Sequence, residues 1–422
     1  MTQDFIRAIS CADDYDPNSM SVDKARRFIR DFLQPVQTKE SLALRSSLGR
    51  VLAEDVLSPY NVPNHNNSAM DGYALNADDL AASGNTTLRI AGTAFAGKAF
   101  EGKVGKGECV RIMTGAVMPA ECDSVVIQEH VQAEGDRITF GEGVKRGQNL
   151  RYAGEDLKQG QVVFAAGHMM RPADLGLIAS LGLGEVKVYR KLRVAFFSTG
   201  DELASIGQPL EAGQVYDSNR YTLYGMLTRL GVEVIDMGVV RDDPVLLEQA
   251  LKNAAVCADV ILTSGGVSVG EADYMKQLLN DLGQVVFWKI AMKPGRPLAY
   301  GKIGNAHYFG LPGNPVSVMV TFYQFVREAM LVLMGQPDPA PVPQLPVICT
   351  CNLKKAPGRT EFQRGVLFAD NDGQWKVQPI GNQGSGVLRS MSEANCFIVL
   401  DERCGNIQAG DTVSVQILDS FI

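Results

Sequence analysis

TSGGVSVGEAD, residues 263–273, is the stretch that decides the fold and raises the first question about function. It follows the short apolar run 258–263, and the residues after it, 274–282, have a helical pattern. An apolar run, a glycine-rich loop and a helix in that order are typical of an α/β unit. The glycines suit a loop that receives an anion, yet the loop ends in two carboxylates, Glu271 and Asp273. The chemistry of the site depends on what reconciles them.

The same alternation extends on both sides of this stretch. Short apolar runs predict strands at 193–198, 232–237, 284–290 and near 306–310. Helices are predicted at 221–230, after Asp242-Asp243-Pro244, and along the apolar segment 316–334. Strands that alternate with helices imply a doubly wound, mostly parallel, three-layer α/β domain, which we place at 191–337. Because Arg327 and Glu328 interrupt the long apolar segment, it is predicted to be a buried helix rather than a membrane span.

The rest of the chain has a different character, so the predicted fold class is multidomain α/β plus β. Residues 59–149 form short strand-like runs separated by glycines, which predicts a β-rich insertion domain. Residues 20–58 and 150–190 are predicted to form one discontinuous helical and linker domain, in which a helix capped by Ser21 packs with a helix begun by Pro172. Prolines between 337 and 346 mark a linker to a C-terminal β-barrel-like domain, 338–422, with a hairpin turn at 370–373.

Composition and charge narrow the class of protein. With 45% apolar residues, 21% charged residues and a net charge of -7, the 422-residue chain is of the ordinary globular class. The acidic balance predicts no nucleic-acid partner and no membrane partner, although a local basic cluster can still hold a small anion. The first residues lack a basic segment followed by an apolar stretch, so a cytoplasmic location is expected. Eight cysteines without a CxxC pair and four scattered histidines favour buried thiols over a zinc site.

Three loops leave the carboxyl ends of predicted strands, where open parallel sheets bind their ligands. They are TGDE at 199–202, SGGVSVGEAD at 264–273 and LPGNP at 311–315. A single glycine loop after a strand is more often an ordinary turn, and none of these matches a P-loop or a dinucleotide fingerprint. Together they predict a phosphate site, and the residues assigned to substrate binding here are Ser198, Gly200, Asp201, Ser264, Gly265, Gly266, Ser268, Gly270, Pro312 and Pro315.

Several carboxylates accompany these loops: Asp201, Glu202, Asp242, Glu271 and Asp273. Beside a phosphate they would repel it unless a cation lay between them, and an oxygen-rich site shared with phosphate suits Mg²⁺. A metal-bridged phosphate, as in a nucleotide ester, therefore reconciles the glycines with the acids. The alternative is that these acids only cap helices, as Asp242 or Asp243 could at the start of the next helix.

A basic cluster lies between residues 288 and 297, where Lys289, Lys293 and Arg296 stand on a segment stiffened by prolines. Such a cluster can bind an oxyanion or a phosphate, but three charges that face solvent would give the same pattern. In the β-rich module, Asp71 precedes a glycine and Thr114 follows a predicted strand, and each could contact a ligand or simply form a turn. The segment 149–156 leaves the same choice open.

A series of motifs in this order resembles the molybdopterin molybdenumtransferase family, and the E domain of gephyrin is similar. The motifs are NSAMDGYA, RIMTG, GEDL, FSTGDEL, RDDP, SGGVSVGEADY, KPGRP, GLPGNPVS, PGRTEFQRG and NCFIVL, and the resemblance covers roughly residues 20–420. The resemblance implies that adenylylated molybdopterin and molybdate are the substrates, and that molybdenum enters the pterin dithiolene while AMP leaves, with the help of Mg²⁺. It also implies an elongated homodimer, whose active cleft lies between the doubly wound domain of one subunit and the β-rich module of its partner.

The resemblance also assigns roles to individual residues. The residues implied for the transfer are Asp71, Thr114, Glu202, Asp242 and Asp273. Asp71 is the principal acid, and the implied Mg²⁺ ligands are Glu202, Asp242 and Asp273. Substrate contacts are implied for Asp156, Lys289, Lys293, Arg296, Ser317, Arg359 and Ser385, of which the last two would complete the molybdate pocket. Some family members have lysine where this chain has Arg296, which keeps the charge but replaces a point donor with a planar fork.

Two other functions fit parts of the pattern. The adenylyltransferase that makes the activated pterin shares the doubly wound domain, but it is usually that domain alone, whereas this chain has further modules that carry MDGYA and GRTEFQR. A non-catalytic, gephyrin-like scaffold is the second alternative, and the complete set of acidic residues argues against it. For the transferase, the expected partners besides a second copy are molybdopterin adenylyltransferase and molybdoenzymes or their chaperones.

Overall fold

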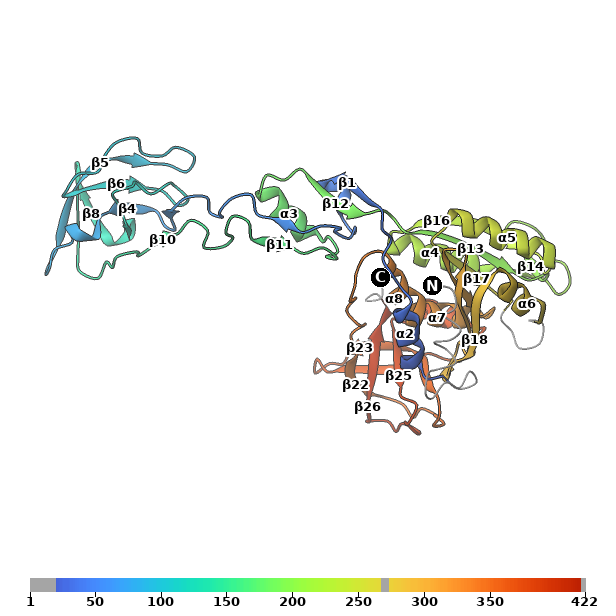
Figure 1. Ribbon diagram of the computed structural model, residues 1–422. Coiled ribbons are helices and arrows are strands. Elements are labelled where there is room, and N and C mark those ends of the chain that lie inside the picture. The colour runs from blue at the N-terminus through green and yellow to red at the C-terminus, as the bar shows by residue number, and fades with distance from the viewer. Residues whose placement is uncertain (1–19, 267–272, 419–422) are drawn as a thin grey trace. The chain divides into compact units, whose positions relative to one another are not determined.

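The computed structural model describes residues 20–266 and 273–418 and, of residues 273–276, only the backbone. The chain forms two compact units (Figure 1). The insertion unit consists of Ala43–Ser46 and Glu54–Val186, and the main unit consists of the described residues up to Leu42, Ser47–Ala53 and those from Lys187 onward. The finer division into four domains stays a prediction.

The main unit contains the doubly wound sheet that the sequence predicts, with the strand order β16-β13-β17-β21-β20-β18. Four neighbours run parallel: β16 (Glu233–Val240), β13 (Arg193–Thr199), β17 (Val260–Ser264) and β21 (Ala306–Leu311). The antiparallel strands β20 (Pro297–Ile303) and β18 (Gly283–Lys289) complete the sheet. The chain leaves β13 to one side for β16 and then to the other side for β17, so the carboxyl ends of β13 and β17 form the topological switch point, where ligands bind in such sheets.

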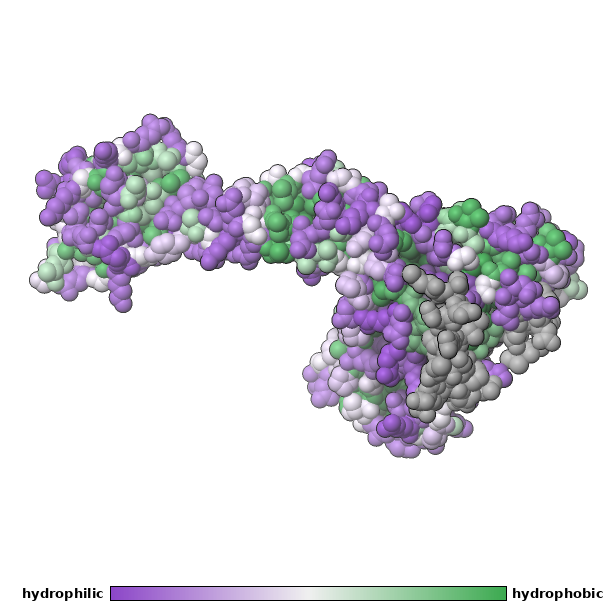
Figure 2. Space-filling view, in the orientation of Figure 1, coloured by the Kyte–Doolittle hydropathy of each residue, from purple (hydrophilic) through white to green (hydrophobic). Residues whose placement is uncertain are grey.

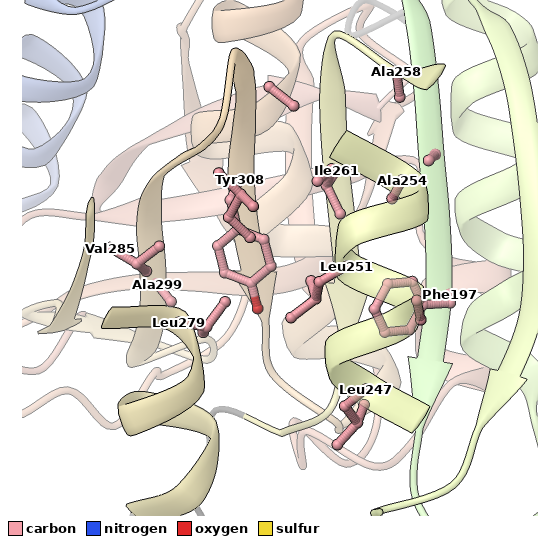
Figure 3. Close-up of a cluster of buried hydrophobic side chains, with 14 residues drawn as sticks. Phe197, Leu247, Leu251, Ala254, Ala258, Ile261, Leu279, Val285, Ala299 and Tyr308 are labelled. Atoms are coloured by element: carbon pink, nitrogen blue, oxygen red, sulfur yellow. The ribbon is translucent and has the colours of Figure 1, made fainter. Parts of the chain in front are cut away.

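Helices cover both faces of this sheet, which makes the three predicted layers. On one face α5 (Pro244–Cys257) packs with α6 (Asp273–Leu282), and on the other α4 (Ser218–Leu230) packs with α7 (Pro315–Thr321). Figure 3 shows the first interface, where Leu247, Leu251 and Ala254 of α5 meet Phe197 and Ile261 of the sheet. Each buried leucine there contributes roughly 1.5–3 kcal/mol, so this core fixes the strands whose ends carry the loops.

The long apolar segment is part of this core, as predicted. By length and composition Pro315–Leu333 is the one described helix that could cross a membrane, but 78% of its most apolar window is buried inside the protein. It runs as α7, a π-helical turn η4 (Phe322–Val326) and α8 (Arg327–Leu333). Burial to this extent is what a core helix of a folded domain shows.

One predicted pairing is wrong. Helix α2 (Val22–Asp31) is capped by Ser21, whose side chain accepts the Lys24 N–H, as expected. It packs against η4 and α8 of the main unit rather than with the segment 150–190, and Arg26 donates to the Gln324 carbonyl oxygen at 2.9 Å. The apolar stripe of a short helix shows that it needs a partner surface, but it does not identify that surface.

The last part of the main unit is a small closed barrel, in agreement with the predicted barrel-like domain. Strands β23 (Thr360–Ala369), β24 (Trp375–Pro379), β22 (Leu345–Cys349), β26 (Thr412–Ile417) and β25 (Cys396–Leu400) pair in that order, and β25 pairs again with β23. Asp370 accepts the Asp372 and Gln374 N–H groups, which forms the predicted hairpin turn. The short strand β19 (Met292–Lys293) pairs with β23, so the predicted basic segment is attached to the barrel.

The insertion unit contains a six-stranded sheet, β7-β4-β6-β5-β9-β8, which lies within the predicted β-rich region. Its central strands are β4 (Gly72–Leu75), β6 (Glu108–Ile112), β5 (Thr86–Ala94) and β9 (Arg137–Phe140), with β7 (Ser124–Ile127) and β8 (Val131–Glu134) at the edges. Beyond the sheet, β2 (Val56–Leu57) pairs with β11 (Val162–Phe164), and α3 (Pro172–Ser180) follows. Apolar residues are visible on the surface near α3 (Figure 2). In the pair of β2 and β11, Leu57 and Val162 stand opposite each other, and each is about half exposed.

Candidate functional site

The switch point of the main unit carries a cavity of about 150 Å³, which we call the glycine pocket. Its described lining residues are Thr199, Gly200, Glu202, Leu203, Asn219, Asp242, Ser264, Gly265, Gly266 and Gly313. The three loops that the sequence singles out therefore meet in one place. The pocket lies where the carboxyl ends of β13 and β17 diverge, as expected for an open parallel sheet.

Glycine is required where these loops approach one another. Gly265 has φ +96°, and a Cβ placed on it would lie 2.5 Å from the Thr199 carbonyl oxygen. The same construction on Gly313 gives a distance of 3.9 Å to the Gly265 Cα, so the third loop also lies close by. Loops at these distances present backbone to a ligand, which is how glycine-rich turns bind anions.

Two of the predicted metal ligands, Glu202 and Asp242, line the glycine pocket together. The alternative of helix capping applies to Asp243, whose Oδ1 accepts the N–H groups of Val245 and Leu246 at 2.9 and 3.0 Å. Asp201 does not line the pocket, but its Oδ1 accepts the Asp242 N–H at 3.3 Å. This hydrogen bond connects the loop after β13 to the loop after β16. Among the described residues no group of three or more metal-binding side chains is close enough to hold an ion, and the side chain of Asp273 is not one of those described.

A second cavity, the cationic pocket, has a volume of about 310 Å³. Its described lining residues are Lys293, Pro294, Gly295, Arg296, Pro297, Pro312, Gly313, Asn314, Ser317, Gln383, Gly384 and Ser385. Lys293 and Arg296 of one predicted segment are thus brought together with Ser317 and Ser385, which were predicted from other parts of the chain, and Gly313 lines both pockets. The Val316 N–H donates to the Ser385 carbonyl oxygen at 3.1 Å, which ties the barrel loop to the start of α7.

Two buried charged residues, Glu361 and Arg364, contact residues that line the cationic pocket. Lys293 Nζ lies 3.8 Å from an oxygen of Glu361, a carboxylate that is only 7% exposed. Arg364 is 1% exposed and donates to the Gly384 carbonyl oxygen at 3.0 Å and to Ser390 Oγ at 3.1 Å. Burial lowers the pKa of Arg364 to about 10, so it stays charged at neutral pH. Arg364 therefore holds the loop that carries Ser385.

Several predicted residues are not brought into either pocket. Pro315 opens α7 and Ser198 is buried at the end of β13, while Lys289 ends β18 and Arg359 is exposed just before β23. None of these four is among the described lining residues of the two pockets. Ser268, Gly270 and Glu271 lie outside the described residues, so their predicted roles stay predictions.

In the insertion unit the predicted acid Asp71 is held by Thr114. Asp71 Oδ1 accepts the Thr114 N–H at 2.7 Å and its hydroxyl at 2.8 Å. These two hydrogen bonds, the backbone one first, lower the pKa of Asp71, so the carboxylate is ionised at neutral pH. The antiparallel pair β4 and β6 places them there, because Gly72 faces Ile112 in the register. Asp156 lies on a bend with its side chain exposed, and its backbone N–H donates to the Val62 carbonyl oxygen.

The sequence reasoning did not single out Asn219, Gln383 or Arg364. Asn219 lies in the first turn of α4 and lines the glycine pocket without belonging to a glycine loop. A signal was present in Asp217-Ser-Asn219, a polar start of a helix that follows the first loop, but the same letters open many ordinary helices. Gln383 is two residues before the predicted Ser385, and Arg364 lies within the motif PGRTEFQRG, but neither position carried a signal that separated it from its neighbours.

Comparison with known proteins covers nearly the whole chain. Three family models match in order, the MoeA N-terminal region (domain I and II) at residues 20–182, a probable molybdopterin binding domain at 195–331 and the MoeA C-terminal region (domain IV) at 346–418. A Haemophilus influenzae protein named molybdopterin molybdenumtransferase is 48% identical over 399 residues, which is 94% of this chain and 98% of that protein. A Mycobacterium tuberculosis protein named molybdopterin molybdenumtransferase 2 is 33% identical over 404 residues, which is 94% and 98% of the two chains.

A solved structure has a similar fold over a similar length. The crystal structure of a molybdopterin biosynthesis MoeA protein from Pyrococcus horikoshii matches with a TM-score of 0.81 and 28% identity, covering 95% of this chain and 100% of that chain. The likeness extends over both units and the barrel, so the multidomain α/β plus β architecture is shared.

Proposed function

The chain belongs to the molybdopterin molybdenumtransferase family, and on this premise we propose that it transfers molybdenum from molybdate to adenylylated molybdopterin and releases AMP. The observation that carries the proposal is that the glycine pocket and the cationic pocket share Gly313. A site suited to a nucleotide phosphate and a site suited to an oxyanion are therefore adjacent, as a reaction between an adenylyl ester and molybdate requires.

The glycine pocket would take the adenylyl phosphate. The backbone at Gly265 and Gly266 lies against the pocket, and Glu202 and Asp242 contribute carboxylates from two other loops. An all-oxygen donor set beside a phosphate site fits Mg²⁺, which usually binds one or two carboxylates together with substrate phosphates. Glu202 and Asp242 would hold the ion, with Asp273 as the third candidate from the sequence. When bound, Mg²⁺ would neutralise charge on the phosphate.

The cationic pocket would take molybdate. Lys293 and Arg296 supply positive charge for a dianion, and the hydroxyl groups of Ser317 and Ser385 can donate to its oxygens. The buried Glu361 lies 3.8 Å from Lys293 Nζ, and its charge favours one position of a lysine side chain that is otherwise 55% exposed. A pre-placed cation requires little rearrangement when the oxyanion binds.

Asp71 would act from the insertion unit of the partner subunit in a homodimer. Its Oδ1 accepts both hydrogen bonds from Thr114, which supports Oδ2 as the oxygen that accepts a proton during the transfer. The lowered pKa keeps this carboxylate ionised before the reaction. Thr114 would position Asp71, and Asp156 would line the same cleft.

The proposal also places the protein in the cytoplasm, between an adenylyltransferase that supplies its substrate and the molybdoenzymes or chaperones that receive its product. The described cysteines are all free thiols, four of them buried, which is usual for proteins of a reducing compartment. The thiolates that bind molybdenum belong to the pterin, so the reaction does not need a cysteine cluster.

The experiment is to mix the purified protein with adenylylated molybdopterin, Mg²⁺ and molybdate, and to measure AMP and molybdenum-loaded cofactor. We expect both products in equal amounts and a loss of both in a folded Asp71→Asn variant. A parallel reaction with ATP and molybdopterin tests the adenylyltransferase alternative, which requires ATP consumption. Normal cofactor formation by Asp71→Asn, or none by the unchanged protein, would overturn the proposal.

A further inference from the structure

Asn219 lines the glycine pocket, and only the nitrogen of its side-chain amide has hydrogen-bond partners among the described residues. Its amide nitrogen donates to Ser264 Oγ at 2.8 Å and to the Gly313 carbonyl oxygen at 2.7 Å. A carbonyl oxygen accepts hydrogen bonds and cannot donate, so this contact fixes which end of the carboxamide faces Gly313. The opposite end, Asn219 Oδ1, is buried and has no partner among the residues that the structure describes.

Thr199, at the end of β13, lines the same pocket and carries a second unsatisfied group. The residue is only 5% exposed, and its Oγ1 has no hydrogen-bond partner within the described ranges. Gly265 leaves room beside this hydroxyl, because a Cβ on Gly265 would lie 2.8 Å from Oγ1. A buried polar group without a partner costs about 1–3 kcal/mol. Both residues line the glycine pocket, so the two unsatisfied groups point to an occupant that bonds to both when it is bound.

The chemistry of these two groups selects the occupant. A carboxamide oxygen only accepts, so the occupant has to donate, which the oxygens of a phosphate ester do not do. The described lining contains no aromatic side chain, and Leu203 is its one large apolar residue, so it offers no surface on which a base would stack. A sugar carries hydroxyl groups that both donate and accept, and it is attached directly to the phosphate of a nucleotide.

We propose that Asn219 Oδ1 and Thr199 Oγ1 bind the ribose hydroxyl groups of the nucleotide, and that Asn219 makes the site specific for a ribonucleotide. Ser264 links the two parts of this subsite, because its Oγ accepts from Asn219 and keeps its own proton for the adjacent phosphate. The inference rests on the proposed function, which makes AMP the leaving group, and it adds which part of AMP is recognised and by which residues.

The test is calorimetric binding of AMP, 2′-deoxy-AMP, 3′-deoxy-AMP and inorganic phosphate to the full-length protein in Mg²⁺. For the unchanged protein we expect at least one deoxy nucleotide to bind about tenfold more weakly than AMP, as for a lost hydrogen bond that leaves its partner unsatisfied. Asn219→Ala should weaken AMP about tenfold and leave that same deoxy nucleotide within twofold of its original affinity. Asn253→Ala, the same change at an exposed position of α5, is the matched control and should bind all four ligands normally.

Thr199→Val provides a second variant, because it removes the hydroxyl with almost no change of shape and keeps the contacts of Asn219. It should weaken AMP binding and leave phosphate binding unchanged. Equal affinity of the unchanged protein for AMP and both deoxy nucleotides would overturn the inference, as would full ribose discrimination by Asn219→Ala and Thr199→Val. Molybdenum insertion is measured separately: ribose discrimination without insertion overturns the proposed function alone, and insertion without discrimination overturns the inference alone.

Discussion

The glycine pocket and the cationic pocket share Gly313 but are built in opposite ways. The glycine pocket is formed by loops that leave neighbouring strands, and its charged side chains are the acids Glu202 and Asp242. The cationic pocket is formed by the segment 293–297, the loop after β21 and the barrel loop 383–385, and its charged side chains are Lys293 and Arg296. A pocket with acidic walls accepts a phosphate only together with a cation, whereas a pocket with basic walls accepts an oxyanion directly. Adjacent pockets of opposite sign would therefore sort two anionic substrates without competition between them.

The largest effect should come from removing the acidic walls. The double substitution Glu202→Gln and Asp242→Asn keeps the size of both side chains but removes the charges that would hold Mg²⁺. We expect AMP release to fall about 100-fold or more, and molybdate binding to stay within twofold. Steady-state AMP assays across a Mg²⁺ titration, with molybdate binding measured in parallel, check this. If the double variant keeps its Mg²⁺ dependence, the two acids are not the ion's ligands.

The next effect should come from the cationic walls. Lys293→Ala removes a charge-assisted contact, so the KM for molybdate should rise about 10- to 100-fold, while AMP affinity stays unchanged. Lys302→Ala, at an exposed position of β20, is the matched control. Lys289→Ala sharpens the comparison further, because Lys289 is not among the described lining residues and should have the smaller effect. A larger effect of Lys289→Ala would contradict the assignment of the pocket to Lys293.

A smaller effect on activity is expected for Arg364, which supports one wall of the cationic pocket without lining it. Arg364→Met leaves buried carbonyl oxygens without donors, so the free energy of unfolding of the barrel should fall by about 2–4 kcal/mol. The KM for molybdate should rise severalfold because the loop with Ser385 loses its anchor, and nucleotide binding should not change. Arg364→Lys keeps the charge and should restore part of the stability. Urea unfolding and molybdate kinetics measure the two effects. An unchanged KM for molybdate in a folded Arg364→Met variant would show that Arg364 has no role in molybdate binding.

The two pockets also differ in how far the sequence predicts them. The glycine pocket follows from local signals, because each loop comes directly after an apolar strand and parallel strands bring their carboxyl ends to one edge. Local signals do not show the direction of a side chain, so Lys289 and Lys293 look equivalent in sequence although only Lys293 lines a described pocket. Asn219 has no glycine beside it and was missed, as was Arg364, whose burial depends on how the barrel closes. The predicted packing partner of helix α2 was wrong for the same reason, because the apolar face of that helix fits several apolar surfaces.

Acid should lower the stability of the sheet that carries both pockets, because His307 lies on β21, the strand that leads into the loop shared by both. Burial lowers the pKa of His307 to about 3, with Lys302 lowering it and Asp259 raising it, and its Nδ1 lies 3.3 Å from the Tyr300 hydroxyl. In the unfolded chain its pKa is near 6.5, as for a model peptide. Between these values the unfolded state binds the extra proton. The contribution of neutral His307 to the free energy of unfolding is therefore fully present above pH 6.5. As the pH drops from 6.5 toward 3, the free energy of unfolding falls by at most about 1.4 kcal/mol per pH unit.

His307→Gln cannot titrate and should flatten this dependence between pH 6.5 and pH 5, although its unfolding free energy at pH 7 is expected to be lower. Both tryptophans, Trp288 and Trp375, lie in the main unit, so fluorescence-detected urea unfolding reports on that unit alone. A variant whose unfolding free energy still fell as steeply as that of the unchanged protein over this range would assign the pH dependence to another group.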